Sequence, residues 1–354
     1  MKTIEVLGRP PGFNKCMNGN LEFWQRQISF TGLTSGSGAT PLADRFRNYT
    51  NTVTGVIDVN RSTDVPSLSN SQYSLKIDVT TAQSSYTASE MSLFEQNLEG
   101  TFIRELYGKS IVVSFWVKSN VTGIFSVAMR NNAFNRSYIK EYTINVADTW
   151  EPKFVVIPHE LVGTWELGTT IGMLVCFGLC GGTNWQQAAN QWNNVDATLS
   201  PNQTNFYSST SNYINFSDIM IHEGRGLADG FYSMTGNPES ELAVCQRYYE
   251  KTYDLSTFAG AATYTGAIGT SITGLSSFAR VVGRPVSFKV KKRATPTVYT
   301  YAMNGALNSI TMNTGTVSCT NNNIGEYGYR PSSTEPSSTA LIQQFLHYTA
   351  DSEY

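Results

Sequence analysis

A single amphipathic helix is expected in a chain whose other regular segments alternate like short β-strands. Asn237 suits the N-cap of this helix because its side chain can accept hydrogen bonds from the free amides of the first turn. Pro238 suits the first helical position because its φ is already fixed. Cys245 and Tyr249 are four residues apart and share one stripe. The pattern predicts a helix over most of residues 237–254, packed on a sheet as a hinge, with Cys245 as a small buried hydrophobe.

Residues 19–236 show the alternation of half-buried strands. Ser74–Val79 alternates apolar and polar residues with a period of two, whereas Ile111–Val117 is a more continuous apolar run, as expected of a central strand. Further strands are predicted at 125–130, 138–144, 153–157, 171–177 and 213–223, and a short helix between 97 and 108. Strands at these intervals, separated by Asn, Gly and Pro turns, indicate an all-β fold, a sandwich of two sheets.

Residues 255–354 form a second, smaller β region that is poorer in bulky side chains. Val286–Val290 alternates, Pro296 suits the start of a strand over 297–301, and 341–348 suits a last strand. A chain of 354 residues is long enough for two domains. The predicted division is an arm over 1–18, a β-sandwich over 19–236, a hinge helix over 237–254 and a C-terminal β domain over 255–354.

The first 18 residues are expected to form an arm rather than part of a folded unit. They contain few apolar side chains and are interrupted by consecutive prolines and a glycine. Their strand-like start could pair with the sheet edge of another protein, where main-chain hydrogen bonds supply the affinity. We therefore expect Ile4, Val6, Pro10 and Phe13 to anchor the chain to a partner.

The charge balance argues against nucleic acid as a partner. Charged residues make up 15% of the chain and the formal net charge is -2, so few phosphates could be neutralised. The one basic cluster, Lys289–Arg293, is interpreted as a solvated strand or as a contact with an acidic neighbouring subunit. No apolar run approaches the roughly 20 residues that cross a bilayer, and the N-terminus does not resemble a signal peptide. We expect synthesis in a cytoplasm and no membrane insertion.

Neither a metal site nor a catalytic site is predicted. Five cysteines form no disulfide framework, and Cys176 and Cys180 lack a second ligand pair, so they are interpreted as one face of a strand that packs closely against another layer. Only three histidines are present, and no nucleophile elbow, phosphate loop or zinc-protease motif occurs. Carboxylate pairs such as Asp218 with Glu223 carry no specificity for glycoside hydrolysis. We expect no enzyme activity and no cofactor.

Aromatic side chains give the clearest candidate binding site. Asn184, Trp185, Asn190 and Trp192 lie in one segment rich in Asn and Gln, and Tyr207 follows nearby. An indole or phenol ring can stack on a sugar while neighbouring amides hydrogen-bond its hydroxyls, so these residues are candidate glycan contacts. The alternative is that the indoles cover the end of the sandwich or fill a subunit contact, since tryptophan is also enriched in interfaces. Trp24 and Trp116 lie in strand-like settings and are expected in the core.

Segments at the start, middle, hinge and end of the chain carry a family resemblance. They are Asn18–Arg26 (NGNLEFWQR) with Ala43–Phe46 (ADRF), Ser114–Ser119 (SFWVKS), Glu241–Lys251 (ELAVCQRYYEK) and Leu346–Glu353 (LHYTADSE). Together they resemble bacteriophage tail-fibre and other virion proteins in which a β-sandwich similar to carbohydrate-binding modules precedes the helix. The family pattern is NGxFxxWQR, ADRW and ELAxCQRYYEK. Here Phe46 stands where tryptophan is usual, and Gln27-Ile28 replaces Gly-Thr.

The resemblance implies a jelly-roll topology for the sandwich and a location in the virion. It also implies a homo-oligomer, with a trimer as the first expectation, and contacts of the N-terminal arm with other virion proteins. A tail-fibre-like or receptor-binding component would further bind a host cell-surface glycan. Two alternatives remain open: a fibre or head-decoration protein with purely structural contacts, and a tailspike that depolymerises polysaccharide.

Overall fold

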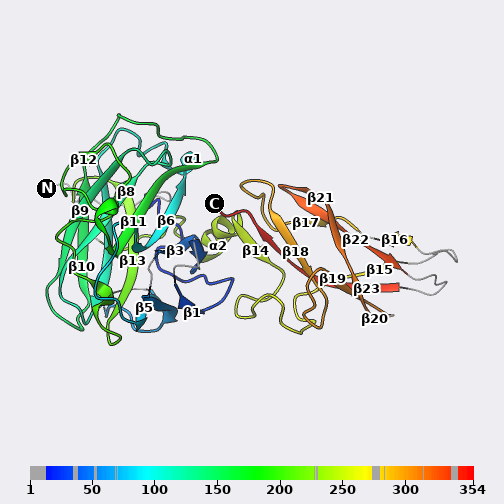
Figure 1. Cartoon of the computed structure of the whole chain (residues 1–354). Helices are drawn as coiled ribbons and strands as arrows, with labels where there is room; N and C mark the ends of the chain where they lie inside the picture. Colours follow the sequence, from blue (N-terminus) through cyan, green and yellow to red (C-terminus); the bar gives the residue numbers. More distant parts are fainter. Residues whose placement is uncertain are drawn as a thin grey trace, which may run out of the picture. The chain divides into compact units, whose positions relative to one another are not determined.

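The computed structural model describes residues 13–34, 39–51, 54–67, 69, 71–226, 228, 230–272, 280–282, 284–313, 315–335 and 342–354. The chain divides into two compact units (Figure 1). The first contains the described residues up to Glu22 and Ile28–Glu241, and the second contains Phe23–Gln27 and Leu242–Tyr354. The boundary falls inside the helix α2 (Pro238–Gln246).

The first unit is a sandwich of two antiparallel sheets. One sheet has the order β1 (Ser29–Leu33), β4 (Val56–Ser62), β5 (Ser74–Thr81), β13 (Tyr213–Glu223), β7 (Ile111–Ser119) and β10 (Glu151–Ile157). The other has the order β12 (Trp192–Asn193), β9 (Ser137–Ile144), β8 (Gly123–Arg130), β11 (Ile171–Gly181), β6 (Met91–Glu99), β3 (Phe46–Asn51) and β2 (Ala39–Pro41). The helix α1 (Gly100–Ile103) and the 3-10 turns η2 (Thr183–Trp185) and η3 (Phe206–Ser208) complete the unit.

Aromatic rings from both sheets meet in the core of the sandwich. Phe94 of β6 and Phe177 of β11 stack at 4.5 Å between ring centroids, and Phe177 contacts Phe115 of β7 edge-on at 5.1 Å. Phe216 of β13 lies 4.5 Å from Phe94. These residues project from one face of their strands, toward the partner sheet. The all-β prediction, a sandwich followed by a short helix and a smaller β unit, is confirmed.

Trp116 was expected in the core, and this expectation is wrong. Phe115 and Val117 on either side of it are buried, whereas Trp116 is half-buried on the opposite face of β7. Successive side chains of a strand point to opposite faces, so only one parity can face the partner sheet. Trp24, in contrast, is buried as expected.

The end of the expected arm is part of the first unit. Asn14 to Asn18 are buried, and the Asn14 side chain donates to the carbonyl of Tyr232 (2.9 Å) and accepts from the amides of Cys16 and Ile221 (both 2.8 Å). Phe13 stacks on His222 at 4.5 Å between centroids. The hydrogen bonds of Asn14 thus attach residues 13–18, which have few apolar side chains, to the first unit. The expected anchoring residues Ile4, Val6 and Pro10 lie outside the described residues.

The second unit contains two smaller antiparallel sheets. In one, β23 (Ile342–Asp351) pairs with β14 (Tyr249–Lys251), β15 (Ile268–Ile272), β18 (Thr297–Tyr301) and β19 (Ser309–Met312), and β20 (Gly315–Ser318) pairs with β19. In the other, β22 (Gly328–Glu335) pairs with β16 (Arg280–Val282), β17 (Val286–Ser287) and β21 (Thr320–Gly325). Their core includes Phe288, Val298, Ile310, Tyr329 and Tyr348.

The hinge helix starts as predicted but ends earlier. The Asn237 side chain accepts from the amides of Glu239 (2.9 Å) and Ser240 (3.1 Å), which confirms the N-cap. The helix stops at Gln246, and Tyr249–Lys251 forms β14 on β23. Pairing with a strand about 100 residues further along the chain overrides the local helical pattern there. Cys245 is buried, as expected.

The basic cluster Lys289–Arg293 is neither a free solvated strand nor an unpaired basic surface. Lys289 donates to the carbonyl of Lys251 (2.9 Å), Lys291 pairs with Glu326 (2.9 Å), Lys292 pairs with Glu250 (2.5 Å) and Arg293 donates to the carbonyl of Ser352 (2.9 Å). Each basic side chain therefore has a partner within its own unit. The interpretation as a solvated strand is therefore wrong, whereas a contact with an acidic neighbouring subunit stays a prediction.

Candidate functional site

Residues 183–205 fold over the outer face of the second sheet of the first unit, and we name them the covering segment. Ala197 and Leu199 of this segment pack against Leu174 and Cys176 of β11. The amide of Asn190 donates to the carbonyl of Ile139 on β9 (2.8 Å). A Cβ at Gly178 would lie 2.4 Å from the Leu199 side chain, so glycine is what permits this close approach. The sequence-based expectation of another layer against this strand face is met by the covering segment.

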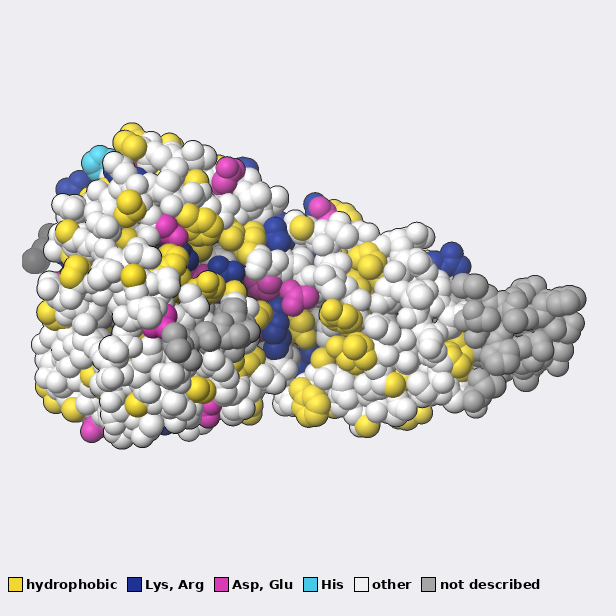
Figure 2. Space-filling view, viewed as in Figure 1, with side chains coloured by type: hydrophobic (Ala, Val, Ile, Leu, Met, Phe, Trp, Pro, Cys, Tyr) yellow, Lys and Arg dark blue, Asp and Glu magenta, His cyan; other side chains and the backbone are white. Residues whose placement is uncertain are grey.

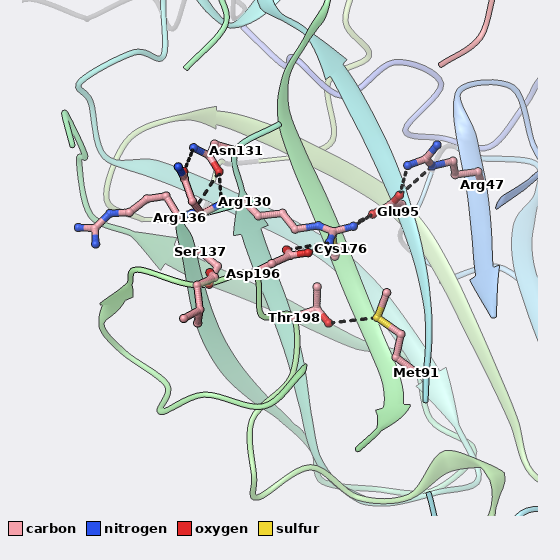
Figure 3. A network of polar contacts seen from close by, with 12 residues as sticks. Arg47, Met91, Glu95, Arg130, Asn131, Arg136, Ser137, Cys176, Asp196 and Thr198 are labelled. Atoms are coloured by element: carbon pink, nitrogen blue, oxygen red, sulfur yellow. Dashed lines mark hydrogen bonds and ion pairs between the residues drawn. The ribbon is translucent and has the colours of Figure 1, made fainter. Parts of the chain in front are cut away.

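A buried network of charges lies between the covering segment and the sheet (Figure 3). Asp196 of the covering segment pairs with Arg130 of β8 (2.9 Å), and Arg130 pairs with Glu95 of β6 (3.1 Å). Glu95 also pairs with Arg47 of β3 (2.6 Å) and accepts from the Cys176 thiol (3.0 Å). Burial alone would raise the pKa of Glu95, but Arg130 and Arg47 outweigh it and hold the pKa below its usual value. The carboxylates of Glu95 and Asp196 are paired with arginines, and Arg130 Nε alone has no partner among the described residues, so we regard the network as structural.

A cavity of about 160 Å³ opens beside the covering segment, and we name it the amide pocket. Its lining residues are Ser84, Tyr86, Cys180, Gly181, Gln186, Leu199, Gln203, Thr204 and Asn205. Tyr86 donates its hydroxyl to Asn205 Oδ1 (2.7 Å), and Gln186 Nε2 donates to the carbonyl of Gly181 (2.7 Å). Gln203 Oε1 accepts from the Ser126 hydroxyl (2.5 Å), and Gln203 Nε2 has no partner among the described residues.

The amide pocket offers neutral groups for hydrogen bonding and one aromatic ring. Burial raises the pKa of the Tyr86 phenol and of the Cys180 thiol, so both stay protonated near neutral pH. The other lining side chains are amides, hydroxyls and one leucine. Such a lining suits a small uncharged ligand with several hydroxyls. It contains no group that would act as a base or a metal ligand at neutral pH.

Two of the residues predicted from sequence have structural roles. Tyr207 is 0% exposed, and its hydroxyl lies 2.7 Å from the Ser92 hydroxyl, so its ring is unavailable for stacking on a glycan. The expectation for Tyr207 is therefore wrong, because this tyrosine of η3 points into the core. Trp185 is half-buried against the apolar cluster beneath the covering segment, and its Nε1 donates to the carbonyl of Ser89 (2.8 Å).

The other predicted residues lie on or near the surface but do not line the amide pocket. Asn184 is exposed, and its backbone N–H donates to the carbonyl of Ala88 (2.9 Å). Asn190 is also exposed, and its side-chain oxygen accepts from Lys140. Trp192 is half-buried between Tyr138 and Trp165, at 5.2 and 5.9 Å between centroids. None of these predicted residues lines the amide pocket, whereas Gln186 and Gln203 of the same segment do.

Trp192 borders a separate apolar crevice at one end of the sandwich. The crevice also contains Ile103, Met129, Trp165 and Met173 and has an internal volume of about 20 Å³. This is room for about one water molecule. Trp192 Nε1 is buried without a partner among the described residues, and the crevice is too small for a sugar. Trp165 was not predicted, and the preceding residues Leu161–Thr164 gave no sequence signal for it.

No metal centre is evident in the described part of the chain, where no group of three or more His, Cys, Asp or Glu side chains is close enough to hold an ion. All five cysteines are buried free thiols. Among the described helices, none is long and apolar enough to cross a membrane.

Comparisons of sequence gave no relative: no protein-family model matches the chain, and no curated protein does. Solved structures show distant similarity. The enzymatically active domain of tailspike protein 4 from bacteriophage CBA120 is 14% identical, with a TM-score of 0.31 over 60% of this chain and 22% of that one. This chain thus corresponds to less than a quarter of the tailspike chain.

Carbohydrate-binding modules are matched over nearly their whole length. A family 61 module in complex with β-1,4-galactotriose is 11% identical, with a TM-score of 0.30 over 60% of this chain and 99% of that one. A family 11 module from Clostridium thermocellum in complex with a mixed-linked tetrasaccharide is 12% identical, with a TM-score of 0.28 over 57% of this chain and 99% of that one. Similarity at this level assigns neither a ligand nor an activity to this chain.

Proposed function

We propose that this chain is a virion structural protein of a tailed bacteriophage. It is a tail-fibre-like or receptor-binding component that forms a homo-oligomer and binds a neutral host glycan in the amide pocket. It is synthesised in the host cytoplasm, has no enzyme activity, and contacts other virion proteins through its N-terminal residues, including Ile4, Val6 and Pro10, whereas Phe13 packs on His222 of its own unit. The similarity of the segments at the start, middle, hinge and end of the chain to virion proteins supports the location.

The observation that carries glycan binding is the lining of the amide pocket. Three amide side chains, Gln186, Gln203 and Asn205, share a 160 Å³ cavity with the ring of Tyr86. Asn205 already donates to the carbonyls of Gln83 and Ser84 and accepts from Tyr86 and the amide of Tyr207, so it positions the Tyr86 ring. The amides of Gln186 and Gln203 can both donate and accept, and so match the hydroxyl groups of a sugar, while the ring can contact its C–H face. The absence of ionised groups from this lining favours a neutral saccharide over a charged one.

Substitution of Gln186 tests the glycan site. Gln186 is half-buried, so Gln186→Ala removes one hydrogen-bonding group with little loss of packing. We expect binding of neutral oligosaccharides to weaken about threefold to tenfold, the value of one hydrogen bond of about 0.5–1.5 kcal/mol. Titration calorimetry with lactose, maltotriose, chitotriose and the acidic comparison sialyllactose measures the change.

The matched control is Gln191→Ala, which makes the same substitution in the same segment. Gln191 is exposed and does not line the amide pocket. Equal affinities for the two variants would contradict a site at Gln186. If no saccharide binds wild-type protein while virion incorporation is normal, the purely structural role is the correct one, and shortening of a host polysaccharide would identify a depolymerising tailspike.

The homo-oligomer is expected to be a trimer. Closed cyclic symmetry would cover strand edges that a single copy leaves open. Multi-angle light scattering at micromolar concentration should give three times the 39.0 kDa mass of one chain. A mass of 39.0 kDa would show that the protein is a monomer in solution and would contradict this part of the proposal.

A further inference from the structure

The second unit has an uncharged surface around a shallow recess. The stretches 255–279 and 294–325 contain no Asp, Glu, Lys, Arg or His. Much of the described part of this unit is accordingly covered by uncharged and hydrophobic side chains on the face seen in Figure 2. Designed soluble domains are given about 25–35% charged residues on their surface, so a stretch of surface without charge is a candidate for recognition.

The recess has a volume of about 460 Å³, within the range of about 300–1,000 Å³ typical of ligand sites. Its lining residues are Ala262, Thr263, Tyr264, Met303, Asn304, Thr311, Gly315 and Thr316. Tyr264 forms an aromatic wall with 63% of its surface exposed. Its ring contacts Phe345 of β23 edge-on at 5.5 Å between centroids, which supports the ring from behind without covering it.

The polar side chains of the recess have hydrogen-bond donors that remain available to a ligand. Thr263 Oγ1 accepts from the amide of Thr265 (3.0 Å), Thr311 Oγ1 accepts from the amide of Met303 (2.9 Å), and Asn304 Oδ1 accepts from the amide of Ala306 (3.1 Å). Each oxygen thus has a backbone partner, while the hydroxyl hydrogens and the Asn304 amide hydrogens can point to a ligand. A ligand that fits is neutral and has several oxygen acceptors and an apolar C–H face.

Two loops line the recess, one with Ala262–Tyr264 and one with Met303 and Asn304, and both are held in place before any ligand binds. Gly305 has φ +84°, and a Cβ there would lie 2.1 Å from the carbonyl oxygen of Gly260, so only glycine allows the loops to approach this closely. On the other side, a ring nitrogen of the buried His347 lies 3.1 Å from the carbonyl of Thr263. A site that is already ordered avoids part of the entropy cost of binding.

From this geometry we infer that the recess at Tyr264 is a second saccharide site, for a neutral glycan, separate from the amide pocket. Sugar C–H groups would contact the face of Tyr264, and sugar oxygens would accept from Thr311 and Asn304. A second site on the same chain would raise avidity for a surface that displays many copies of one glycan. Several chains in one oligomer would raise the avidity in the same way.

Tyr264→Ala tests this site. We expect affinity for neutral oligosaccharides at this site to fall about tenfold or more, because the apolar contact with the ring is lost. Titration calorimetry with lactose, maltotriose and chitotriose, and with sialyllactose as the acidic comparison, should resolve one site in the variant and two in wild type. The matched control is Tyr327→Ala, since Tyr327 is 69% exposed in the same unit and does not line the recess.

Each outcome decides the inference. Loss of one site in Tyr264→Ala but not in Tyr327→Ala supports it. An unchanged isotherm in Tyr264→Ala overturns it, and if Gln186→Ala still weakens binding, the proposed amide-pocket function stands without it. A change in oligomer mass in Tyr264→Ala, with saccharide binding intact, would show that the recess is a contact between copies of the chain. Stronger binding of sialyllactose than of lactose would overturn the assignment to neutral glycans.

Discussion

Glu95→Ala is expected to lower the free energy of unfolding of the first unit by about 3–5 kcal/mol, because it removes a buried carboxylate from the buried Arg130 and the partly buried Arg47. The Glu95 side chain is 0% exposed and pairs with both Arg47 and Arg130, and the Arg130 side chain is itself only 6% exposed. Arg130 would keep only Asp196 as an ionic partner. Denaturant titration followed by tryptophan fluorescence measures the change, and hydrogen exchange should show the covering segment opening more often.

The control for this prediction is Glu223→Ala. Glu223 pairs with Lys109 at 2.6 Å, but the two side chains are 56% and 45% exposed, so the expected change is within about 1 kcal/mol. Similar losses in the two variants would contradict a special role for the buried network.

The effect of Glu95 also depends on pH. Despite its burial, the carboxyl has a pKa below the usual 4.5 because Arg130 and Arg47 favour its ionised form. Ionised Glu95 therefore stabilises the fold fully above about pH 4.5, and this contribution is lost as the pH falls through the lowered folded-state pKa. The difference between wild type and Glu95→Ala should shrink as the pH is lowered below 4.5.

Lys292→Met is expected to destabilise the second unit by a similar amount, about 3–5 kcal/mol, because Glu250 would remain as a buried charge. Both side chains are 0% exposed, and Lys292 donates to Glu250 Oε2 (2.5 Å) and to the carbonyl of Gln246. Burial lowers the pKa of Lys292 to about 8, although Glu250 beside it favours the charged form. Thermal and denaturant unfolding of the full chain measure the loss.

A double variant separates the charge from the packing. In Lys292→Met with Glu250→Gln no charge remains buried, and the glutamine oxygen can still accept from the Tyr348 hydroxyl, so most of the stability should return. Lys291→Met is the matched control, because Lys291 and Glu326 form an exposed pair and little change is expected. A double variant as unstable as Lys292→Met alone would show that packing, rather than charge, is lost.

The fold class could be predicted because its signals are local. The alternation over 74–79 and the apolar run over 111–117 each lie within a strand of the structure, and the strand β18 begins directly after Pro296. The Asn237 N-cap likewise depends only on residues two and three positions further along the chain. Such features need no knowledge of distant partners.

Strand β6 shows where local signals fail. It contains Glu95, Gln96, Asn97 and Glu99, all of them buried, and a run of polar residues does not predict a central strand. Glu95 is tolerated there because Arg47 and Arg130, from two other strands, supply opposite charge. The partners that make a buried carboxylate acceptable are set by the sheet, not by its neighbours in sequence.

The candidate site was decided almost entirely by tertiary structure. Sequence alone indicated an aromatic and amide-rich segment, which is a matter of composition. Folding of that segment over the sheet turned Trp185 inward, while Tyr207 filled the core and Gln186 met Tyr86 and Asn205 in a cavity. Residue type thus determined which chemistry was available, whereas long-range packing determined which side chains remained free to use it, because burial removes a ring or an amide from contact with any ligand.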